Sequence, residues 1–284
     1  MFPVLSNEEI APQLHRMVIA APRVARARKP GQFVMVRAAL DGACGERIPL
    51  TIADDDPRAG TITLIIQAVG LSTRAIVAVP AGGSLSDVAG PLGQPTEIER
   101  LGRVACVGGG VGTAVLFPLA KGLAEAGNAL TCIIGGRSER YVILRQELGA
   151  FATALHVTTE DGSLGEKGFV TLPLKRLLDD PEQRPAAVYA VGPVPMMRAI
   201  CELTRSYGVR TIVSLNPIMV DGTGMCGGCR VTVGGKVKFA CVDGPEFDGH
   251  QVDFAELSAR QATYLELDAH GCRIDQQLAQ MPEE

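Results

Sequence analysis

One aspartate and three cysteines near the C-terminus have the types and spacing of ligands for a redox metal centre. Asp221, Cys226, Cys229 and Cys241 follow the pattern D-x4-C-x2-C-x11-C within a glycine-rich stretch. In the plant-type pattern C-x4-C-x2-C…C, four anionic side chains hold the two irons of a [2Fe–2S] cluster. A carboxylate replaces the first thiolate here, and it can bind iron through oxygen. The pattern therefore predicts a [2Fe–2S] cluster.

The same residues leave two other interpretations open. Three cysteines and an aspartate could close a tetrahedral zinc site, or the cysteines could serve only as small buried apolar groups. Core packing suits the five scattered cysteines, which are Cys44, Cys106, Cys132, Cys201 and Cys272. It does not explain three cysteines in one glycine-rich loop, whose glycines permit the left-handed turns that wrap a small cluster. A disulfide is not expected in a chain without an export signal.

Length and composition limit the possible functions. A chain of 284 residues has room for two or three domains, and 46% apolar with 20% charged residues indicates well-filled cores. The formal charge of −4, without a long basic run, argues against a nucleic-acid partner. The N-terminus does not resemble a secretory signal, and no apolar stretch is long enough to span a membrane. We therefore expect a cytoplasmic protein in a reducing compartment, without membrane association.

The first part of the chain is typical of an antiparallel barrel. Short runs rich in β-branched residues at 15–20, 30–37, 49–53 and 61–67 alternate with Gly, Pro and Asp turn signals. Short strands at this spacing favour a closed barrel. We expect a barrel domain over residues 1–98, and we interpret 89–95 as a linker that leaves it.

The pattern changes after residue 98 to strands that alternate with helices. Apolar strand segments at 103–107, 130–134, 156–159, 187–191 and 210–215 are separated by helical segments. This alternation predicts a parallel α/β sheet over residues 99–215. The ligand loop lies in a C-terminal segment, 216–284, which also contains a predicted hairpin with Gly234-Gly235 as its type I′ turn.

A glycine loop, 108–113, follows the first strand of the predicted sheet and opens a helix. In this position backbone N–H groups and the helix dipole can hold a phosphate, although a tight turn without a ligand remains open. A second glycine-rich strand end, 191–197, is placed at the same carboxyl edge, where ligands gather. Arg137, in place of an acidic residue, ends the second strand and could favour a 2′-phosphate. It could equally be a solvated surface residue.

In the predicted barrel, residues 47–52 offer a cation, a hydroxyl and a flat apolar segment in sequence. A flavin uses such groups, with Arg for its pyrophosphate. The segment could also be an ordinary strand with one exposed arginine. Residues 67–73 could form a second phosphate-binding turn that leads into a helix.

Together, these segments resemble the ferredoxin–NADP reductase superfamily over nearly the whole chain. The likeness is greatest to the small flavin-containing electron-transfer subunits of dihydroorotate dehydrogenase, sulfide dehydrogenase and the NADH-dependent reduced ferredoxin:NADP oxidoreductase. It rests on the segments at 30–36, 47–52, 90–93, 108–113 and 192–197, together with the ligand loop. The dihydroorotate-type subunits have Cys at the position of Asp221, so the aspartate resembles the sulfide dehydrogenase and transhydrogenase-type branch.

The resemblance implies a barrel that binds FAD, a domain that binds NAD(H) or NADP(H), and a C-terminal [2Fe–2S] segment. The flavin contacts that it implies are Arg47, Pro49, Leu50, Thr51, Gln67, Val69, Gly70, Ser72 and Thr73. The nicotinamide nucleotide contacts that it implies are Gly110, Val111, Gly112, Thr113, Gly192, Pro193 and Met196. No side chain need act as an acid or base in hydride transfer, so we expect no catalytic residue.

The resemblance also implies an oxidoreductase that acts with a partner. The expected partner is a larger subunit with flavin and [4Fe–4S] clusters, related to the small subunit of glutamate synthase, and ferredoxin is a further candidate. Three alternatives remain open at this point. They are a dihydroorotate dehydrogenase electron-transfer subunit, a sulfide-dependent reductase, and a non-catalytic nucleotide-binding protein with a structural zinc.

Overall fold

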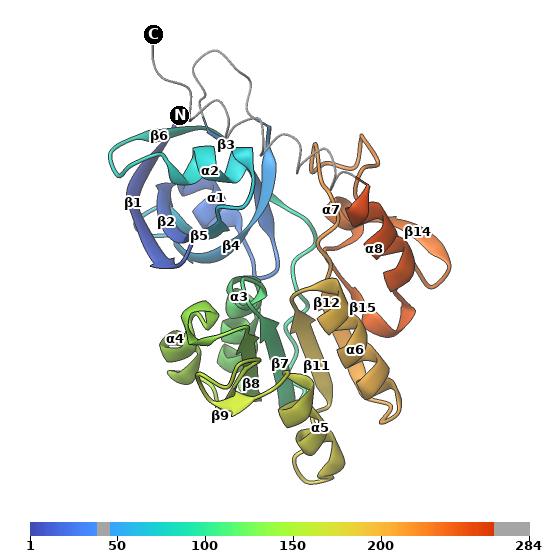
Figure 1. The fold of residues 1–284 in the computed structure, drawn as a ribbon. Helices are drawn as coiled ribbons and strands as arrows, with labels where there is room; N and C mark the ends of the chain where they lie inside the picture. The colour runs from blue at the N-terminus through green and yellow to red at the C-terminus, as the bar shows by residue number, and fades with distance from the viewer. Residues whose placement is uncertain (39–45, 264–284) are drawn as a thin grey trace.

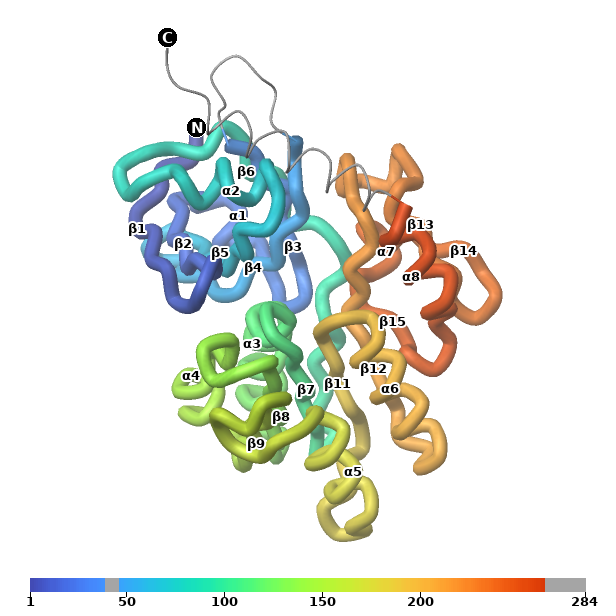
Figure 2. The backbone as a smooth tube through the Cα atoms, in the orientation of Figure 1, coloured from blue at the N-terminus to red at the C-terminus, as the bar shows by residue number. Residues whose placement is uncertain are grey.

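The computed structural model describes residues 1–38 and 46–263, which form a β-barrel, an α/β sheet and a small C-terminal segment (Figure 1). Two of the scattered cysteines, Cys44 and Cys272, lie outside the described residues, as do the last 21 positions, 264–284, of the expected C-terminal segment. In Figure 2 the barrel lies beside one end of the sheet, and the C-terminal segment lies along the sheet's edge next to α6. No helix within the described ranges is long and apolar enough to cross a membrane.

The barrel is a closed antiparallel sheet of six strands in the order β1-β2-β5-β4-β3-β6. It is closed by pairing of β1 with β6, where Phe2 lies opposite Leu85. Alternate side chains point inward and build a core that includes Met17, Ile62 and Leu64. The strands are β1 (Phe2–Ala11), β2 (Leu14–Ala20), β3 (Phe33–Ala38), β4 (Ile48–Asp56), β5 (Thr61–Gln67) and β6 (Ser84–Leu92), with two short helices, α1 (Pro22–Ala27) and α2 (Leu71–Val77).

The barrel confirms the expected architecture and corrects one segment. The four runs expected to be strands all contribute to strands, whereas β1 and β6 were not foreseen. The interpretation of residues 89–95 as a linker was wrong for the first half of that segment. Strand β6 continues to Leu92, which pairs with Phe33 of β3. Gly90 and Pro91 weakened the strand signal in the sequence, and the pairing with β3 overrides it.

The second unit is a seven-stranded sheet in the order β10-β9-β8-β7-β11-β12-β15. All neighbouring strands are parallel except β15, which runs antiparallel to β12 at one edge. The predicted parallel sheet is therefore confirmed. Its elements are β7 (Arg103–Gly109), α3 (Gly112–Glu125), β8 (Ala129–Gly136), α4 (Arg145–Gly149), β9 (Ala154–Thr159), β10 (Glu166–Lys167), α5 (Thr171–Asp179), β11 (Ala187–Val191), α6 (Val194–Arg205) and β12 (Arg210–Ser214), with a 3-10 turn at Glu139–Tyr141.

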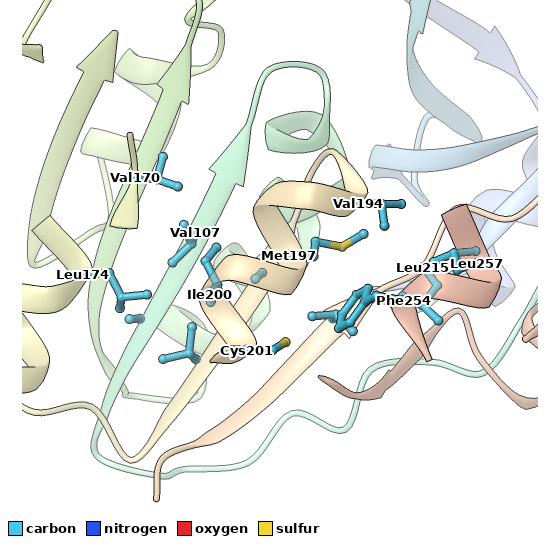
Figure 3. Close-up of a cluster of buried hydrophobic side chains, with 14 of the residues drawn as sticks. Val107, Val170, Leu174, Val194, Met197, Ile200, Cys201, Leu215, Phe254 and Leu257 are labelled. Carbon is cyan, nitrogen blue, oxygen red and sulfur yellow. The ribbon is translucent and has the colours of Figure 1, made fainter. Parts of the chain in front are cut away.

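Helices cover both faces of this sheet. Because side chains alternate along β7, Val104 and Cys106 pack under α3 and α4, whereas Ala105 and Val107 pack under α5 and α6. Figure 3 shows the second of these cores, in which side chains of α5 and α6 meet strand residues such as Val107. The sheet is thus a rigid platform, and the loops at the carboxyl ends of its strands are available for ligands.

The C-terminal segment contains the hairpin of β13 (Arg230–Val233) and β14 (Lys236–Phe239), then α7 (Ala240–Asp243), β15 (Glu246–Asp248), a 3-10 turn at Gly249–Gln251 and α8 (Phe254–Ala262). The predicted hairpin is confirmed, and both turn glycines have positive φ, 58° at Gly234 and 72° at Gly235. This segment shares the sheet through β15. The division of the chain at residues 98 and 215 stays a prediction.

Candidate functional site

A cleft of about 1190 Å³ lies between the barrel and the carboxyl edge of the sheet. Small-molecule pockets typically measure about 300–1,000 Å³, so this cleft has room for more than one small ligand group. Its walls come from β4 and β5 of the barrel and from the loops after β7, β8, β9 and β11 of the sheet. Barrel and sheet therefore present their ligand-facing residues to one shared space.

Two glycine loops meet at the floor of the cleft. β7 and β11 are adjacent, and the chain leaves them toward opposite sides of the sheet, which makes their carboxyl ends a topological switch point. A Cβ atom added to Gly192 would lie 3.3 Å from Cα of Gly109, and one added to Gly112 would lie 2.5 Å from the carbonyl oxygen of Val191. Only glycine allows the two strand ends to approach this closely.

The N-terminus of α3 gives this floor an electrostatic preference. The helix begins at Gly112 and runs for 14 residues, so the positive end of its dipole lies at the cleft. Gly110 has a φ of +55°, and an added Cβ atom there would meet open space. Backbone at such a position can approach an anion closely, and helix N-termini of this kind bind phosphate. The geometry suits the pyrophosphate of a dinucleotide.

Most of the residues expected at the two nucleotide sites line the cleft. They are Pro49, Leu50, Thr51, Gln67 and Thr73 from the barrel and Gly110, Val111, Gly112, Gly192, Pro193 and Met196 from the sheet. The structure thus brings together segments that are about 140 residues apart in the chain. Whether they contact a nucleotide stays a prediction.

Five expected contacts do not line the cleft, namely Arg47, Val69, Gly70, Ser72 and Thr113. The guanidinium of Arg47 pairs with the carboxylate of Asp87 on β6. Thr113 is buried, and its amide donates to the carbonyl of Gly110, which shapes the turn. The hydroxyl of Thr73 accepts hydrogen bonds from the amides of Val69 and Gly70 and so holds the turn before α2.

Some cleft residues were not recognised in the sequence. Thr158 and Glu160 lie at and just after the carboxyl end of β9, and Phe169 comes from the loop after β10. The Oγ1 atom of Thr158 is buried without a hydrogen-bond partner within the described part of the chain. The rule that ligands gather at carboxyl strand ends could have identified the first two, because a strand was expected at 156–159. Further cleft residues that were not recognised in the sequence are Gln13, Leu14, Phe33, Tyr141, Asn216, Pro217, Met219 and Pro245.

The four expected metal ligands form two pairs. The thiol of Cys226 donates to Oδ1 of Asp221 across 3.4 Å, and the thiol of Cys229 lies 3.2 Å from that of Cys241. The second distance is well beyond the covalent S–S length of about 2.05 Å, so these are free thiols. Cys226 is exposed, whereas Cys229 and Cys241 are buried.

Hydrogen bonds and burial determine the charge of the ligand groups. Backbone N–H groups of Thr223 and Cys226 donate to the carboxylate of Asp221 and lower its pKa to about 2. Burial, followed by the adjacent thiol of Cys229, raises the pKa of Cys241 to about 12. Asp221 is therefore already anionic at neutral pH, whereas Cys241 becomes a thiolate only when a metal replaces its proton.

The paired arrangement suits a two-iron centre. Each iron of a [2Fe–2S] cluster takes two protein ligands, and the loop supplies one exposed pair and one buried pair. Within residues 1–38 and 46–263, no three His, Cys, Asp or Glu side chains converge closely enough to hold one metal ion. The residues present therefore fit the cluster.

The ligand loop packs against the barrel beside the cleft. A Cβ atom added to Gly222 would lie 2.6 Å from Cγ of Met35 and 3.1 Å from Cδ1 of Leu92. Met35 is the cross-strand neighbour of Pro49, which lines the cleft. Neighbouring strands lie about 4.8 Å apart. The ligand loop and the barrel wall of the cleft are thus separated by little more than one strand.

Comparison with known proteins agrees with this geometry. The iron-sulfur cluster binding domain of dihydroorotate dehydrogenase B matches residues 216–253. The chain is 46% identical over 263 residues to a homolog of the dihydroorotate dehydrogenase B (NAD(+)) electron transfer subunit from Thermotoga maritima, covering 93% of this chain and 91% of the relative. It is 34% identical over 257 residues to the corresponding subunit of Bacillus velezensis, covering 88% of this chain and 96% of that one.

Two solved structures show the fold. A chain of the NADH-dependent reduced ferredoxin-NADP oxidoreductase, studied for flavin-based electron bifurcation, superimposes with a TM-score of 0.87 at 45% identity over 94% of both chains. Phthalate dioxygenase reductase shares the fold at 14% identity, with a TM-score of 0.61 over 82% of this chain and 85% of that one. The expected resemblance is confirmed: this chain belongs to the family of ferredoxin reductase-like electron transfer subunits that includes those of dihydroorotate dehydrogenase B and their homologs.

Proposed function

We propose that this chain passes electrons between NAD(H), FAD and a [2Fe–2S] cluster on behalf of a larger partner subunit. The observation that carries the proposal is the shared cleft, which joins the barrel wall to the two glycine loops while the ligand loop packs on the same barrel. A nicotinamide nucleotide supplies two electrons as a hydride, a flavin can release them singly, and a cluster carries one at a time. The three regions that we propose bind these groups are adjacent in that order, which supports the proposal.

The barrel wall of the cleft supports the flavin assignment. Pro49 and Leu50 offer a flat apolar surface, and Thr51 and Gln67 offer polar groups at its edge. Arg47 now pairs with Asp87. To neutralise the flavin pyrophosphate, its guanidinium would have to exchange that carboxylate for phosphate oxygens, an exchange that the planar bidentate geometry of arginine favours.

The sheet edge supports binding of a dinucleotide in the same cleft. The N-terminus of α3 would hold the pyrophosphate, and the loop at Gly192 and Pro193 would place the nicotinamide toward the barrel. Met196 packs over both loops, since its side chain lies where Cβ atoms of Gly109 or Gly192 would be. It would therefore determine how deeply the nicotinamide enters.

We further propose NAD(H) rather than NADP(H) at this site. Arg137 and Glu160 both line the cleft, at the ends of the adjacent strands β8 and β9. A carboxylate at such an edge accepts hydrogen bonds from ribose hydroxyls and repels a 2′-phosphate. Phe169, which is 64% exposed, offers an aromatic surface for adenine nearby. Glu160→Gln should reduce the ratio of NADH to NADPH efficiency in flavin reduction.

Exposed apolar side chains around the ligand loop support a partner interface. Met225 is 89% exposed and Val220 is 62% exposed. The ligand Cys226, which follows Met225 in the sequence, is also exposed. Apolar side chains gathered at the exit of an electron path are typical of a docking surface. We propose that a larger flavin and [4Fe–4S] subunit, related to the small subunit of glutamate synthase, covers them, with ferredoxin as a further redox partner of the complex.

A dihydroorotate dehydrogenase complex is the second candidate, because the matching iron–sulfur domain and several relatives carry that description. Asp221 favours the first candidate through its resemblance to the transhydrogenase-type branch. Isolation of the native complex separates the two. The accompanying subunit would reduce NADP with ferredoxin and NADH in the first case, and would oxidise dihydroorotate in the second.

The first experiment is the visible spectrum of anaerobically purified protein, with iron and acid-labile sulfide counts. Flavin bands with about two irons and two sulfides per chain would support the proposal. If flavin is present but iron is absent, the cluster must be dropped from the proposed function. A protein that binds neither group after reconstitution would contradict it, as would a cluster that NADH cannot reduce in the flavin-loaded chain.

A further inference from the structure

The last described helix, α8, is held firmly against the rest of the protein. Phe254 and Leu257 are 9% and 1% exposed, and they pack beside Met197 and Leu215 in the core under α6 (Figure 3). Residues three and four positions apart lie on the same face of a helix. Arg260 and Gln261 follow Leu257 by three and four positions. They therefore lie on the buried face of α8, which packs against other segments of the same chain.

Both residues contact the part of the C-terminal segment that contains the ligand loop. Nη2 of Arg260 donates a hydrogen bond of 3.0 Å to the carbonyl oxygen of Gly228, and this contact is partly buried. Nε2 of Gln261 donates to the carbonyl oxygen of Asn216 across 2.8 Å. The helix thus contacts the segment at its beginning and within the ligand loop itself.

The contact at Gly228 brings a permanent positive charge close to the cluster ligands. Gly228 lies between Cys226 and Cys229 in the sequence, and its own amide lies 3.4 Å from the thiol of Cys226. The guanidinium of Arg260 therefore contacts a residue that is next to Cys229 and two positions from Cys226, which are one ligand of each pair. Arginine stays protonated at every physiological pH, and partial burial reduces the screening of its charge by water.

We propose that Arg260 sets the reduction potential of the [2Fe–2S] cluster. Net charge and hydrogen bonding around a cluster are the means by which a protein adjusts its potential. A reduced cluster carries one more negative charge than an oxidised one, so a fixed cation beside it stabilises the reduced form more and raises the potential. Arg260 acts through its charge and through its hydrogen bond to the carbonyl oxygen of Gly228, which positions the ligand loop. The inference rests on the cluster assignment proposed above.

The test compares three full-length variants after anaerobic purification. Arg260→Gln removes the charge but keeps a hydrogen-bond donor, Arg260→Lys keeps the charge, and Arg198→Gln removes a positive charge from exposed α6, where Arg198 pairs with Glu202. The measurements are the iron and sulfide content and the cluster's potential in a dye-mediated reductive titration followed by electron paramagnetic resonance.

We expect Arg260→Gln to retain two irons and to show at least a threefold lower ratio of reduced to oxidised cluster at the wild-type midpoint. A tenfold change would correspond to 59 mV for a one-electron couple. Arg260→Lys and Arg198→Gln should stay close to the wild-type midpoint.

Four outcomes would overturn the inference. Arg260→Gln could keep the wild-type midpoint, it could shift no further than Arg198→Gln, or Arg260→Lys could shift as far as Arg260→Gln. The fourth outcome is loss of iron from Arg260→Gln. It would assign Arg260 a purely structural role and so overturn the inference. Absence of iron from the wild-type chain would instead contradict the proposed function, so the two failures are distinguishable.

Discussion

Gly112, the first residue of α3, lies directly against the carbonyl of Val191 at the end of β11, where an added Cβ atom would be 2.5 Å from the oxygen. Both partners are backbone at the ends of central elements, so neither can move aside cheaply. This contact holds the two glycine loops together at the switch point of the sheet. It links the packing of the sheet to the shape of the cleft floor.

Gly112→Ala should therefore impair both stability and nucleotide binding. Forcing a methyl group into packed backbone costs about 1–3 kcal/mol, and the displaced loop should raise KM for NADH in flavin reduction. Thermal unfolding and steady-state kinetics are the measurements. Gly149→Ala is the matched control, because its added Cβ atom would make an ordinary contact of 3.6 Å with Leu155. Equal behaviour of the two variants would mean that the close approach has no functional consequence.

Removing one thiol of the buried ligand pair should release iron. Cys241→Ala leaves Cys229 without the partner that lies 3.2 Å away, and one iron then lacks a protein ligand. We expect the iron count to fall well below two per chain. Cys106→Ala is the control, since Cys106 is equally buried but lies within the core under α3. An iron count that falls equally in both variants would point to general destabilisation.

Replacing the carboxylate ligand should retain the cluster but change its potential. Thiolate and carboxylate differ in how strongly they donate to iron, so Asp221→Cys should keep about two irons with a shifted midpoint. Asp221→Ala should bind less iron, because no side chain replaces the ligand. Electron paramagnetic resonance during a reductive titration measures both. A midpoint unchanged in Asp221→Cys would show that Asp221 is not a ligand.

Glu246 should make the stability of the protein depend on pH. Burial raises the pKa of its carboxyl from the usual 4.5 to about 7, and the hydroxyl of Thr96 donates to it across 2.7 Å. The folded state therefore binds the proton more tightly than the unfolded state. The stability contribution of this group is greatest at low pH and is lost as the pH rises from about 4.5 through 7.

Glu246→Gln, which stays uncharged, should consequently raise the free energy of unfolding by about 3 kcal/mol at pH 8 and by about 1 kcal/mol or less at pH 5. Urea unfolding at the two pH values is the measurement. Asp180→Asn, at the C-terminal end of α5, serves as the control for replacing a carboxylate by an amide. A gain for Glu246→Gln that is the same at both pH values would contradict a titrating carboxyl.

Charge on the exposed apolar surface of the ligand loop should weaken the complex. Met225→Glu places a carboxylate where we propose that the larger subunit covers an apolar side chain, and an unpaired buried charge is costly. Affinity for the partner should fall at least tenfold, while reduction of the chain's own flavin by NADH stays unchanged. Leu5→Glu on β1 is the matched control, since Leu5 is also exposed, at 53%. Equal loss of affinity in both would argue against this interface.

The sequence by itself determined the local chemistry of this protein. The spacing of Asp221, Cys226, Cys229 and Cys241 indicated a cluster, and apolar runs followed by glycine predicted the parallel strands and their loops. These signals are local, because turn glycines and ligand spacing act within a few residues. The tight Gly234-Gly235 hairpin was predictable for the same reason.

Only the tertiary structure decided which of these segments meet. Strand β6 was missed because its pairing with β3 overrides a glycine and a proline that usually interrupt strands. The cleft position of Glu160, the partial burial of Glu246 and the contact between Arg260 and Gly228 depend on residues far apart in the chain. No local pattern encodes such contacts, since they arise from packing the barrel, the sheet and α8 around shared cores.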